Sequence, residues 1–197
     1  MSADVDQGRR RLLVTATALT GAVGAGFALT PFVASWEPSA RAKALGAPIE
    51  IDISKLEPGA MLKVEWRGKP VWVLRRTPEM LKEVDQAKPF LLDPESLGSV
   101  QPAYAKNETR ALKPEYFVVL GVCTHLGCSP MEKFQPGDVT VSADWPGGFY
   151  CPCHGSKFDL AGRVWKSVPA PSNLTVPPYS FVSDRRIVVG TDATHAA

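Results

Sequence analysis

Hydrophobic and polar positions follow two different patterns along this chain of 197 residues, and the pattern changes near residue 48. From Leu12 to Ala34 no residue is charged and no face is polar. A run of that length can cross the hydrocarbon core of a membrane as a helix, at about 1.5 Å per residue. The pattern therefore predicts a single membrane anchor over residues 12–36, although several glycines and threonines dilute its leucines.

Beyond residue 48 the pattern becomes that of short β-strands. In residues 49–53 isoleucine alternates with polar residues, which is typical of a strand with one buried face. Residues 61–66 and 70–75 predict a hairpin across a short turn that contains a glycine. Thr77, followed directly by proline, predicts the N-cap of a helix that runs to about residue 87.

The second half of the chain contains further short apolar runs. Residues 116–122 predict a buried strand, and residues 149–150 a shorter one, whereas the proline-rich residues 88–115 predict mostly irregular structure. Four more short strands are predicted near the C-terminus, at 163–165, 174–176, 180–182 and 186–189. We therefore expect one mainly β domain over residues 49–197.

Composition and charge narrow the class of protein without identifying it. Hydrophobic residues make up 45% of the chain and the formal net charge is +2, as in an ordinary globular protein. A net charge this small gives no preference for an acidic partner. No basic stripe carries interleaved aromatic residues, so we expect no nucleic-acid binding.

Three arginines stand directly before the uncharged run. Positive charge beside a membrane helix stays on the cytoplasmic side, so residues 1–11 are predicted to be cytoplasmic. Arg9 and Arg10, followed by leucines, resemble the twin-arginine export signal, whose route moves folded proteins. The small residues Ala40 and Ala42, on either side of Arg41, would suit a cleavage site, but the uncharged run exceeds an ordinary signal-peptide core and favours a retained anchor. The alanine-rich residues 37–48 are predicted to be a flexible linker.

All four cysteines and two of the three histidines lie in two short segments. Residues 123–128, which we call box one, read C-T-H-L-G-C, and residues 151–156, box two, read C-P-C-H-G-S. A glycine in each box lets the backbone turn tightly, as a loop around a metal must. The remaining histidine, His195, lies in the polar C-terminal tail and is predicted to be solvated.

Each box offers one cysteine–histidine pair at short range: Cys123 with His125, and Cys151 with His154. Two thiolates and two imidazoles suit either one tetrahedral zinc ion or a two-iron cluster with different ligands on each iron. Both kinds of site fit these four residues.

Each box contains one further thiol, Cys128 in box one and Cys153 in box two, and these two thiols help to distinguish a zinc site from a two-iron cluster. A zinc site made from two Cys–His pairs has no use for two extra thiols. In an oxidising compartment, however, two such thiols can join the loops as a disulfide. The spare cysteines therefore favour a cluster over zinc.

Box one followed by box two resembles, letter by letter, the Rieske iron–sulfur subunit of quinol–cytochrome c oxidoreductases, the cytochrome bc1 complexes. The resemblance implies a Rieske-type antiparallel β domain with two cluster-binding loops, over about residues 116–172, and one [2Fe-2S] cluster. By position it also implies that one iron is held by Cys123 and Cys151 and the other by His125 and His154.

The resemblance assigns roles to five neighbouring residues as well. Cys128 pairs with Cys153 in a disulfide that clamps the two loops. Ser156 is a hydrogen-bond donor to the cluster. Leu126 supplies an apolar docking surface or shields the cluster, and the proline-rich segment around Pro169 covers it.

The chain departs from the family pattern at two places. Members of the family commonly carry a tyrosine two residues after the box-two serine, and this chain has Phe158 there. Because donors to cluster sulfurs stabilise the reduced state, the missing hydroxyl predicts a lower midpoint potential. The spacing between the boxes is also long, so residues 133–148 are expected to form an added loop or hairpin that brings bulk near the cluster and no ligand.

The resemblance implies the catalytic subunit of quinol–cytochrome c reductase. The subunit accepts an electron and a proton from ubiquinol, or a related quinol, in a site shared with cytochrome b, and passes the electron to cytochrome c1. His154 would meet the quinol and His125 would share the exposed tip, because a bound cation makes the far N–H of an imidazole easier to lose. We expect a dimeric complex in the bacterial inner membrane, with the cluster domain on the periplasmic side.

Three alternatives stand beside this interpretation. The Rieske subunit of arsenite oxidase also combines twin-arginine export with both boxes, although the anchor and linker favour the bc1 subunit. A structural zinc-binding module would leave the spare cysteines without a purpose. A Rieske ferredoxin that serves an oxygenase needs neither the export segment nor Cys128 and Cys153.

Overall fold

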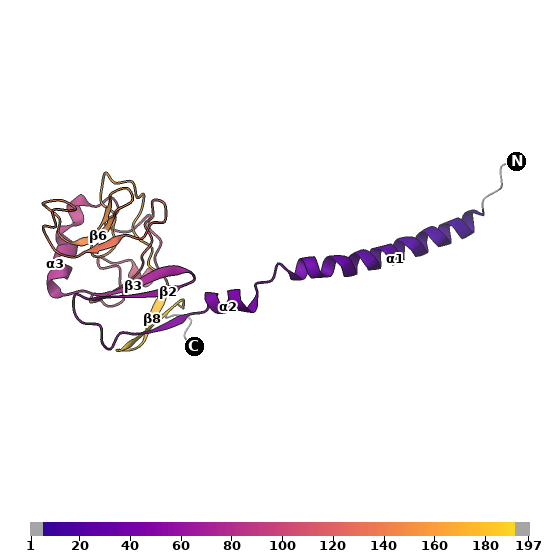
Figure 1. The fold of residues 1–197 in the computed structure, drawn as a ribbon, viewed down its shortest axis with the longest axis horizontal. Coiled ribbons are helices and arrows are strands. Elements are labelled where there is room, and N and C mark those ends of the chain that lie inside the picture. The colour runs from indigo at the N-terminus through magenta and orange to yellow at the C-terminus, as the bar shows by residue number, and fades with distance from the viewer. Residues whose placement is uncertain (1–5, 192–197) are drawn as a thin grey trace. The chain divides into compact units, whose positions relative to one another are not determined.

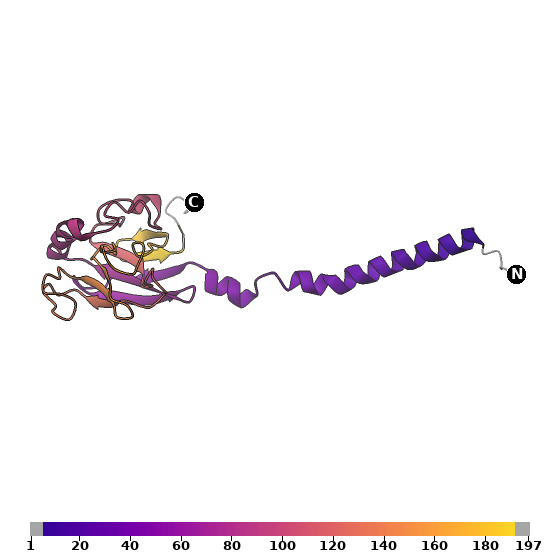
Figure 2. The same cartoon turned by 90° about the horizontal axis from the view of Figure 1, so that it is seen from above.

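The computed structural model describes residues 6–191 (Figures 1 and 2). These residues fall into two compact units that divide between Ala44 and Leu45. The predicted solvation of His195 concerns a residue that lies outside the described part of the chain.

The first unit is dominated by helix α1 (Gln7–Ala34), none of whose residues is buried. The helix begins five residues before the uncharged run because the Asp6 side chain caps it, accepting hydrogen bonds from the backbone N–H groups of Gly8 and Arg9 at 2.9 and 3.2 Å. Its 28 residues span about 42 Å, and its apolar side chains project on every face. By length and composition α1 can therefore cross a membrane, as predicted.

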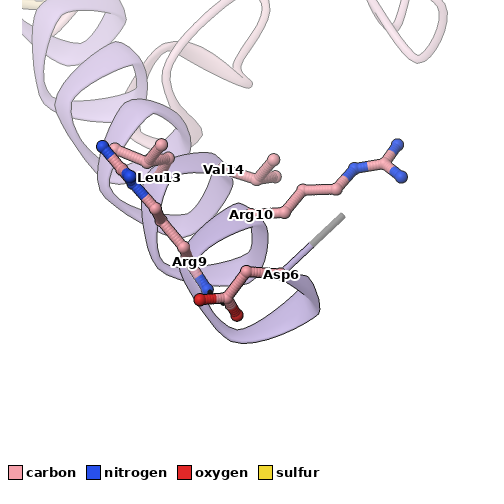
Figure 3. A pocket seen from close by; sticks show the side chains of 5 residues that line it. All are labelled: Asp6, Arg9, Arg10, Leu13 and Val14. Carbon is pink, nitrogen blue, oxygen red and sulfur yellow. Dashed lines mark hydrogen bonds between the residues drawn. The ribbon is translucent and has the colours of Figure 1, made fainter. Parts of the chain in front are cut away.

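The twin arginines lie in the first turns of α1 (Figure 3). Arg9 and Arg10 leave the helix in different directions, and both are exposed. The hollow between them and the side chains of Leu13 and Val14 is a gap on the surface of a single helix. It is open to solvent and does not constitute a binding site.

The segment predicted to be a linker contains a short helix, α2 (Ala40–Gly46), which sequence analysis missed. Ser39 starts it, because its hydroxyl accepts a hydrogen bond from the backbone N–H of Ala42 at 3.2 Å. None of its residues is buried, so the sequence of α2 has no hydrophobic periodicity from which the helix could be predicted. The flexibility of residues 37–48 stays a prediction.

The described residues of the second unit form three antiparallel sheets of three strands each. The sheets are, in spatial order, β1 (Ile49–Asp52), β9 (Arg186–Val189) and β8 (Tyr179–Ser183); β2 (Met61–Trp66), β3 (Lys69–Arg75) and β4 (Tyr116–Leu120); and β5 (Met131–Lys133), β6 (Gly148–Cys151) and β7 (Ser156–Phe158). Helix α3 (Pro78–Gln86) follows β3, and two short 3₁₀ helices, η1 (Lys88–Phe90) and η2 (Ala103–Ala105), interrupt the irregular segment.

Most of the predicted elements of this unit are confirmed, including the β2–β3 hairpin and the helix capped by Thr77, whose hydroxyl accepts from the N–H of Met80 at 3.3 Å. Two predicted strands are wrong. Within residues 163–165 only Val164 and Trp165 pair, each in an isolated bridge. Residues 174–176 belong to no strand, and the two prolines that follow them cannot donate to a ladder. Strands β5 and β7 were missed because three residues are too short for an alternation to show.

One hydrophobic core joins all three sheets. Residues 71–74 of β3 and 117–119 of β4 are almost fully buried, and Trp72 stacks on Phe149 of β6 with the ring centroids 5.3 Å apart. Gly121, just before box one, lies against the Trp72 ring so closely that a Cβ there would fall 2.1 Å from it. The glycine therefore lets box one sit directly on the core.

Buried arginines fix the segment that follows β7. Arg163 forms an ion pair with Asp159 at 2.7 Å, and both side chains are almost fully buried. Arg110 donates to the carbonyls of Ala161 and Leu174 at 3.1 and 2.8 Å. Burial lowers the pKa of the Arg110 guanidinium to about 10, which leaves it charged at neutral pH. These contacts hold the chain between box two and the proline-rich segment in place.

Candidate metal centre

Two strands deliver the two boxes. Box one follows β4 and box two begins at the last residue of β6. Each box makes the same turn: the N–H of Gly127 donates to the carbonyl of Cys123 at 3.0 Å, and the N–H of Gly155 donates to that of Cys151 at 2.9 Å. Both glycines adopt positive φ, +84° and +78°, which explains why each box needs a glycine there. Two equivalent loops thus face one another.

The first cysteines of the two boxes form a buried pair of free thiols. Cys123 and Cys151 are each 2% exposed. Burial raises the pKa of the Cys123 thiol and contact with Cys151 raises it further, whereas the backbone N–H of His125 and the hydroxyl of Ser156 lower it. Two adjacent buried thiols can both ionise only beside a positive charge, and a metal centre supplies one.

The two imidazoles lie together at the tip of the boxes. The ring centroids of His125 and His154 are 4.8 Å apart and the rings are nearly perpendicular, at 85°. The Nδ1 atom of His125 is buried and has no hydrogen-bond partner among the described residues. Buried ring nitrogens ordinarily have a partner, so this atom is suited to bind a metal. The His154 side chain is exposed.

The remaining two cysteines form the predicted disulfide. Cys128 is joined to Cys153, and this bond links the two loops directly. The sulfur atoms of Cys128, Cys151 and Cys153 all lie within 4.8 Å of one another. Because the disulfide occupies two of these three sulfurs, Cys151 is the one whose sulfur remains free to bind a metal. The disulfide therefore forms one wall of the site.

Two hydrogen bonds attach the proline-rich segment to the boxes, and sequence analysis did not anticipate them. The Thr124 hydroxyl donates to the carbonyl of Ser172 at 2.6 Å, and the N–H of Ala170 donates to Oγ of Ser156 at 3.1 Å. Ala170 is fully buried, whereas Pro169 is exposed. Partners separated by 48 and 14 residues leave no local signal in the sequence. The two bonds seat the segment against the site.

The inner face of the β6–β7 pair carries the residues nearest the thiols. Cys151 pairs with Ser156 and Phe149 with Phe158, so these four side chains share one face. Phe158 is fully buried. The Ser156 hydroxyl lies within hydrogen-bond reach of the Cys123 sulfur. A hydroxyl on the ring at position 158 would lie on the same side of the sheet as Cys151.

Two further predictions concern the surroundings. Leu126 is 72% exposed at the tip of box one, so its side chain is free to contact a partner. The long segment 133–148 is the connection between β5 and β6, and residues 139–141 form no strand. It joins those strands at the end away from Cys151, so the expected bulk is not beside box two. An ion pair between Lys133 and Asp138, at 3.0 Å, braces the connection.

Two models of known protein families match this chain, and together they cover most of its length. A model described as the Rieske [2Fe-2S] domain matches residues 49–179. A second, described as the ubiquitinol–cytochrome c reductase Fe-S subunit TAT signal, matches residues 1–39. The first match covers more than half of the chain and contains both boxes.

Curated relatives agree with these matches. The ubiquinol–cytochrome c reductase iron–sulfur subunit of Allochromatium vinosum is 59% identical, over 95% of this chain and 91% of the relative. The subunit of the same name from Bradyrhizobium diazoefficiens is 42% identical, over 92% and 94%. Among solved structures, a chain of a hyperthermophilic respiratory complex III has a TM-score of 0.48 at 26% identity, over 90% of this chain and 98% of that chain.

Fold and site together define a small β domain in which two loops offer two thiols and two imidazoles to a metal centre. The chain belongs to the Rieske family and, within it, to the iron–sulfur subunits of ubiquinol–cytochrome c reductase. The predicted fold class is thereby confirmed, and the predicted cofactor, a [2Fe-2S] cluster, is the one that the Rieske domain carries. The free thiols and the unpartnered Nδ1 atom fit that cofactor.

Proposed function

We propose that this chain is the membrane-anchored electron carrier of a bacterial quinol–cytochrome c reductase. The observation that carries the proposal is the buried pair of free thiols beside two imidazoles, in loops clamped by a disulfide. A zinc module would need the same four ligands but no clamp. Close relatives along nearly the whole chain are named as subunits of this reductase.

In the proposed site the sulfurs of Cys123 and Cys151 would hold one iron, and ring nitrogens of His125 and His154 would hold the other. For His125 the ligand atom is Nδ1, because that atom is buried and lacks any partner in the described chain. When bound, the cluster accepts one electron, at a potential raised by its two neutral nitrogen ligands. The Ser156 hydroxyl then donates to a sulfur of the site, since its oxygen already accepts from Ala170.

The protein's own residues carry the proton and exclude water. His154 is exposed, so its free ring N–H can meet a quinol hydroxyl and exchange a proton there. His125 shares the tip. Leu126 offers an apolar contact to the quinol site, and the buried Ala170 closes the other side of the loops. Docking of the tip against a partner thus brings the quinol to the imidazoles and keeps bulk water away.

The partner subunits that we propose come from the family of the chain, and its position in the membrane comes from α1. In this proposal a cytochrome b subunit shares the quinol site, cytochrome c1 accepts the electron, ubiquinol or a related quinol is the donor, and the complex is a dimer. Helix α1 crosses the bacterial inner membrane once and residues 49–197 lie on the periplasmic side, which the match to the twin-arginine signal model supports. The segment 37–48 tethers the carrier.

A deletion experiment tests this function against its alternatives. Membranes from cells that lack the chain should lose quinol-dependent reduction of cytochrome c, regain it with the intact chain, and stay inactive with Cys123→Ser. If deletion abolished arsenite oxidation instead, the chain would belong to that enzyme. If it left both activities unchanged, the electron-carrier role would be excluded.

A further inference from the structure

The sheet β5–β6–β7 has a second face, which the proposed site does not use. Its inner face is buried and carries Cys151 and Ser156. On the outer face the strand register places Met131 opposite Tyr150, and Tyr150 opposite Lys157. Directly opposed residues of antiparallel strands project to the same side, so these three side chains form a continuous line.

Two aromatic rings extend this line beyond β7. The Lys157 ammonium lies 5.5 Å from the centroid of the Trp165 ring, and Trp165 stacks on Phe90 at 5.2 Å. We call these five residues, from Met131 to Phe90, the outer row. Met131 and Phe90, at its two ends, are 47% and 49% exposed. With neighbouring strands about 4.8 Å apart, the outer row is roughly 20 Å long.

Between β6 and the proline-rich segment, the charge that solvent reaches has one sign. Residues 148–172, all of them described, contain four charged side chains. Asp159 and Arg163 are buried and pair with one another, so Lys157 and Lys166 carry the charge that solvent reaches. Neither lysine forms an ion pair with a described carboxylate, and Lys166 donates to the carbonyl of Pro89 at 2.9 Å. The surface beside box two therefore carries positive charge next to the aromatic rings of Trp165 and Phe90.

The position of the outer row connects it to electron transfer. Tyr150 immediately precedes Cys151, and Lys157 immediately follows Ser156. A protein that covers the outer row consequently lies beside the cluster loops as well. Exposed methionine and aromatic side chains are typical of protein–protein contacts, whereas a lysine buried in a contact requires an opposite charge.

We propose that the outer row is the contact surface for the electron acceptor, which places a carboxylate against Lys157. This inference rests on the proposed electron-carrier function and names the chemistry of its partner: an acidic surface on a haem protein. Lys166 extends the positive field at the edge of the contact. Complementary charge of this kind steers association and fixes the orientation in which two proteins meet.

Small oxidants of opposite charge test the field of the two lysines. The full-length chain in non-ionic detergent, with its cluster reduced, is mixed in stopped flow with ferricyanide, which is trianionic, or with tris(phenanthroline)cobalt(III), which is tricationic. Each oxidant removes one electron. At low salt the double variant Lys157→Gln with Lys166→Gln should slow the ferricyanide reaction about threefold or more and speed the cobalt reaction, and 0.5 M salt should remove both effects.

Lys82→Gln is the matched control for the single variant Lys157→Gln, because each removes one positive charge and Lys82 lies at an exposed position on α3. Helix α3 follows the end of β3 that pairs with the start of β4, whereas box one follows the other end of β4. Equal changes in the Lys82 and Lys157 variants would overturn the inference. If the reduced wild-type chain passed no electron to either oxidant, the electron-carrier function itself would fail.

Cross-linking in the intact membrane complex identifies the partner. A carbodiimide joins lysines to carboxylates that already touch, and peptide mass spectrometry locates the bond. We expect a bond from Lys157 to an aspartate or glutamate of the haem-bearing acceptor subunit, and none from Lys82. A bond from Lys157 to the quinol-site subunit, or equal amine acetylation of Lys157 in the free chain and the complex, would overturn the inference.

Discussion

The two boxes hold two pairs of cysteines that are alike in chemistry and only a few residues apart, yet the fold uses them differently. Cys123 and Cys151 are 2% exposed and remain free thiols. Cys128 is half-buried, Cys153 is exposed, and the two are joined as a disulfide. The inner pair lies where strands end against the core, and the outer pair lies where the loops turn back.

This difference separates two requirements of an electron carrier. The inner pair provides ligands in a site from which water is excluded, where the charge of a metal centre is felt most strongly. The outer pair provides no ligand and holds the loops against one another. Because the two requirements fall on different residues, substitutions should separate loss of the cluster from loss of stability.

The largest effect is expected from the inner pair. Cys123→Ser or Cys151→Ser removes a thiolate that no other residue of the site can replace, because the disulfide occupies the sulfurs nearby. Iron content should fall from about two atoms per chain to nearly none. Iron analysis of the purified full-length variants measures this, and full retention of iron would show that the ligand assignment is wrong.

The next effect concerns the outer pair. Replacing both Cys128 and Cys153 by alanine leaves every proposed ligand in place but releases a bridge across a sequence separation of 25 residues. Loop-closure entropy then predicts a loss of about 3.5 kcal/mol in the free energy of unfolding. The midpoint of urea unfolding reports this loss. Unchanged unfolding together with complete loss of iron would mean that the disulfide serves the metal site rather than the fold.

A smaller effect is expected from hydrogen bonds to the inner pair. Phe158→Tyr adds a donor on the face shared with Cys151, and Ser156→Ala removes one. A hydrogen bond to a charged group worth about 1.4 kcal/mol more in the reduced state shifts a one-electron potential by roughly 60 mV. The midpoint potential should therefore rise in the first variant and fall in the second.

Phe181→Tyr, on β8, is the matched control for the added hydroxyl, and it should leave the potential unchanged. A redox titration followed by EPR measures all three variants. If the potential of Phe158→Tyr stayed at the wild-type value, the low potential predicted from the missing hydroxyl would be refuted.

The smallest effect on the protein itself is expected at Leu126. Because this side chain is 72% exposed, Leu126→Ala should change the free energy of unfolding by less than about 0.5 kcal/mol. It should leave the potential unchanged and slow quinol oxidation in the complex, since it removes only an apolar contact to the partner. An altered EPR spectrum of the isolated chain would instead assign Leu126 a role in shielding the cluster.

Part of the candidate site could be predicted from the sequence because its cysteines, histidines and glycines are concentrated in two contiguous boxes. Both glycine turns and the disulfide could be anticipated from them. The contacts of Thr124 with Ser172 and of Ser156 with Ala170 could not, because each joins residues brought together only by the completed fold. The outer row likewise depends on strand register, which β7, with three residues, is too short to reveal.

The fold was predicted unevenly for similar physical reasons. A long uncharged run revealed α1, and short apolar segments on either side of a turn revealed the β2–β3 hairpin. Sequence patterns failed for α2, which buries nothing, and for residues 174–176, of which Leu174 and Val176 are buried but which belong to no strand. Burial alone therefore does not distinguish a strand from an irregular segment held by single backbone hydrogen bonds.

The measurement that tests the central claim most directly is EPR spectroscopy of the purified full-length chain, oxidised and then reduced, with iron and zinc analysis of the same sample. The account predicts no signal when oxidised, a Rieske-type signal on reduction, and about two irons per chain without zinc. About one zinc per chain and no signal in either state, from protein made under cluster-loading conditions, would contradict it.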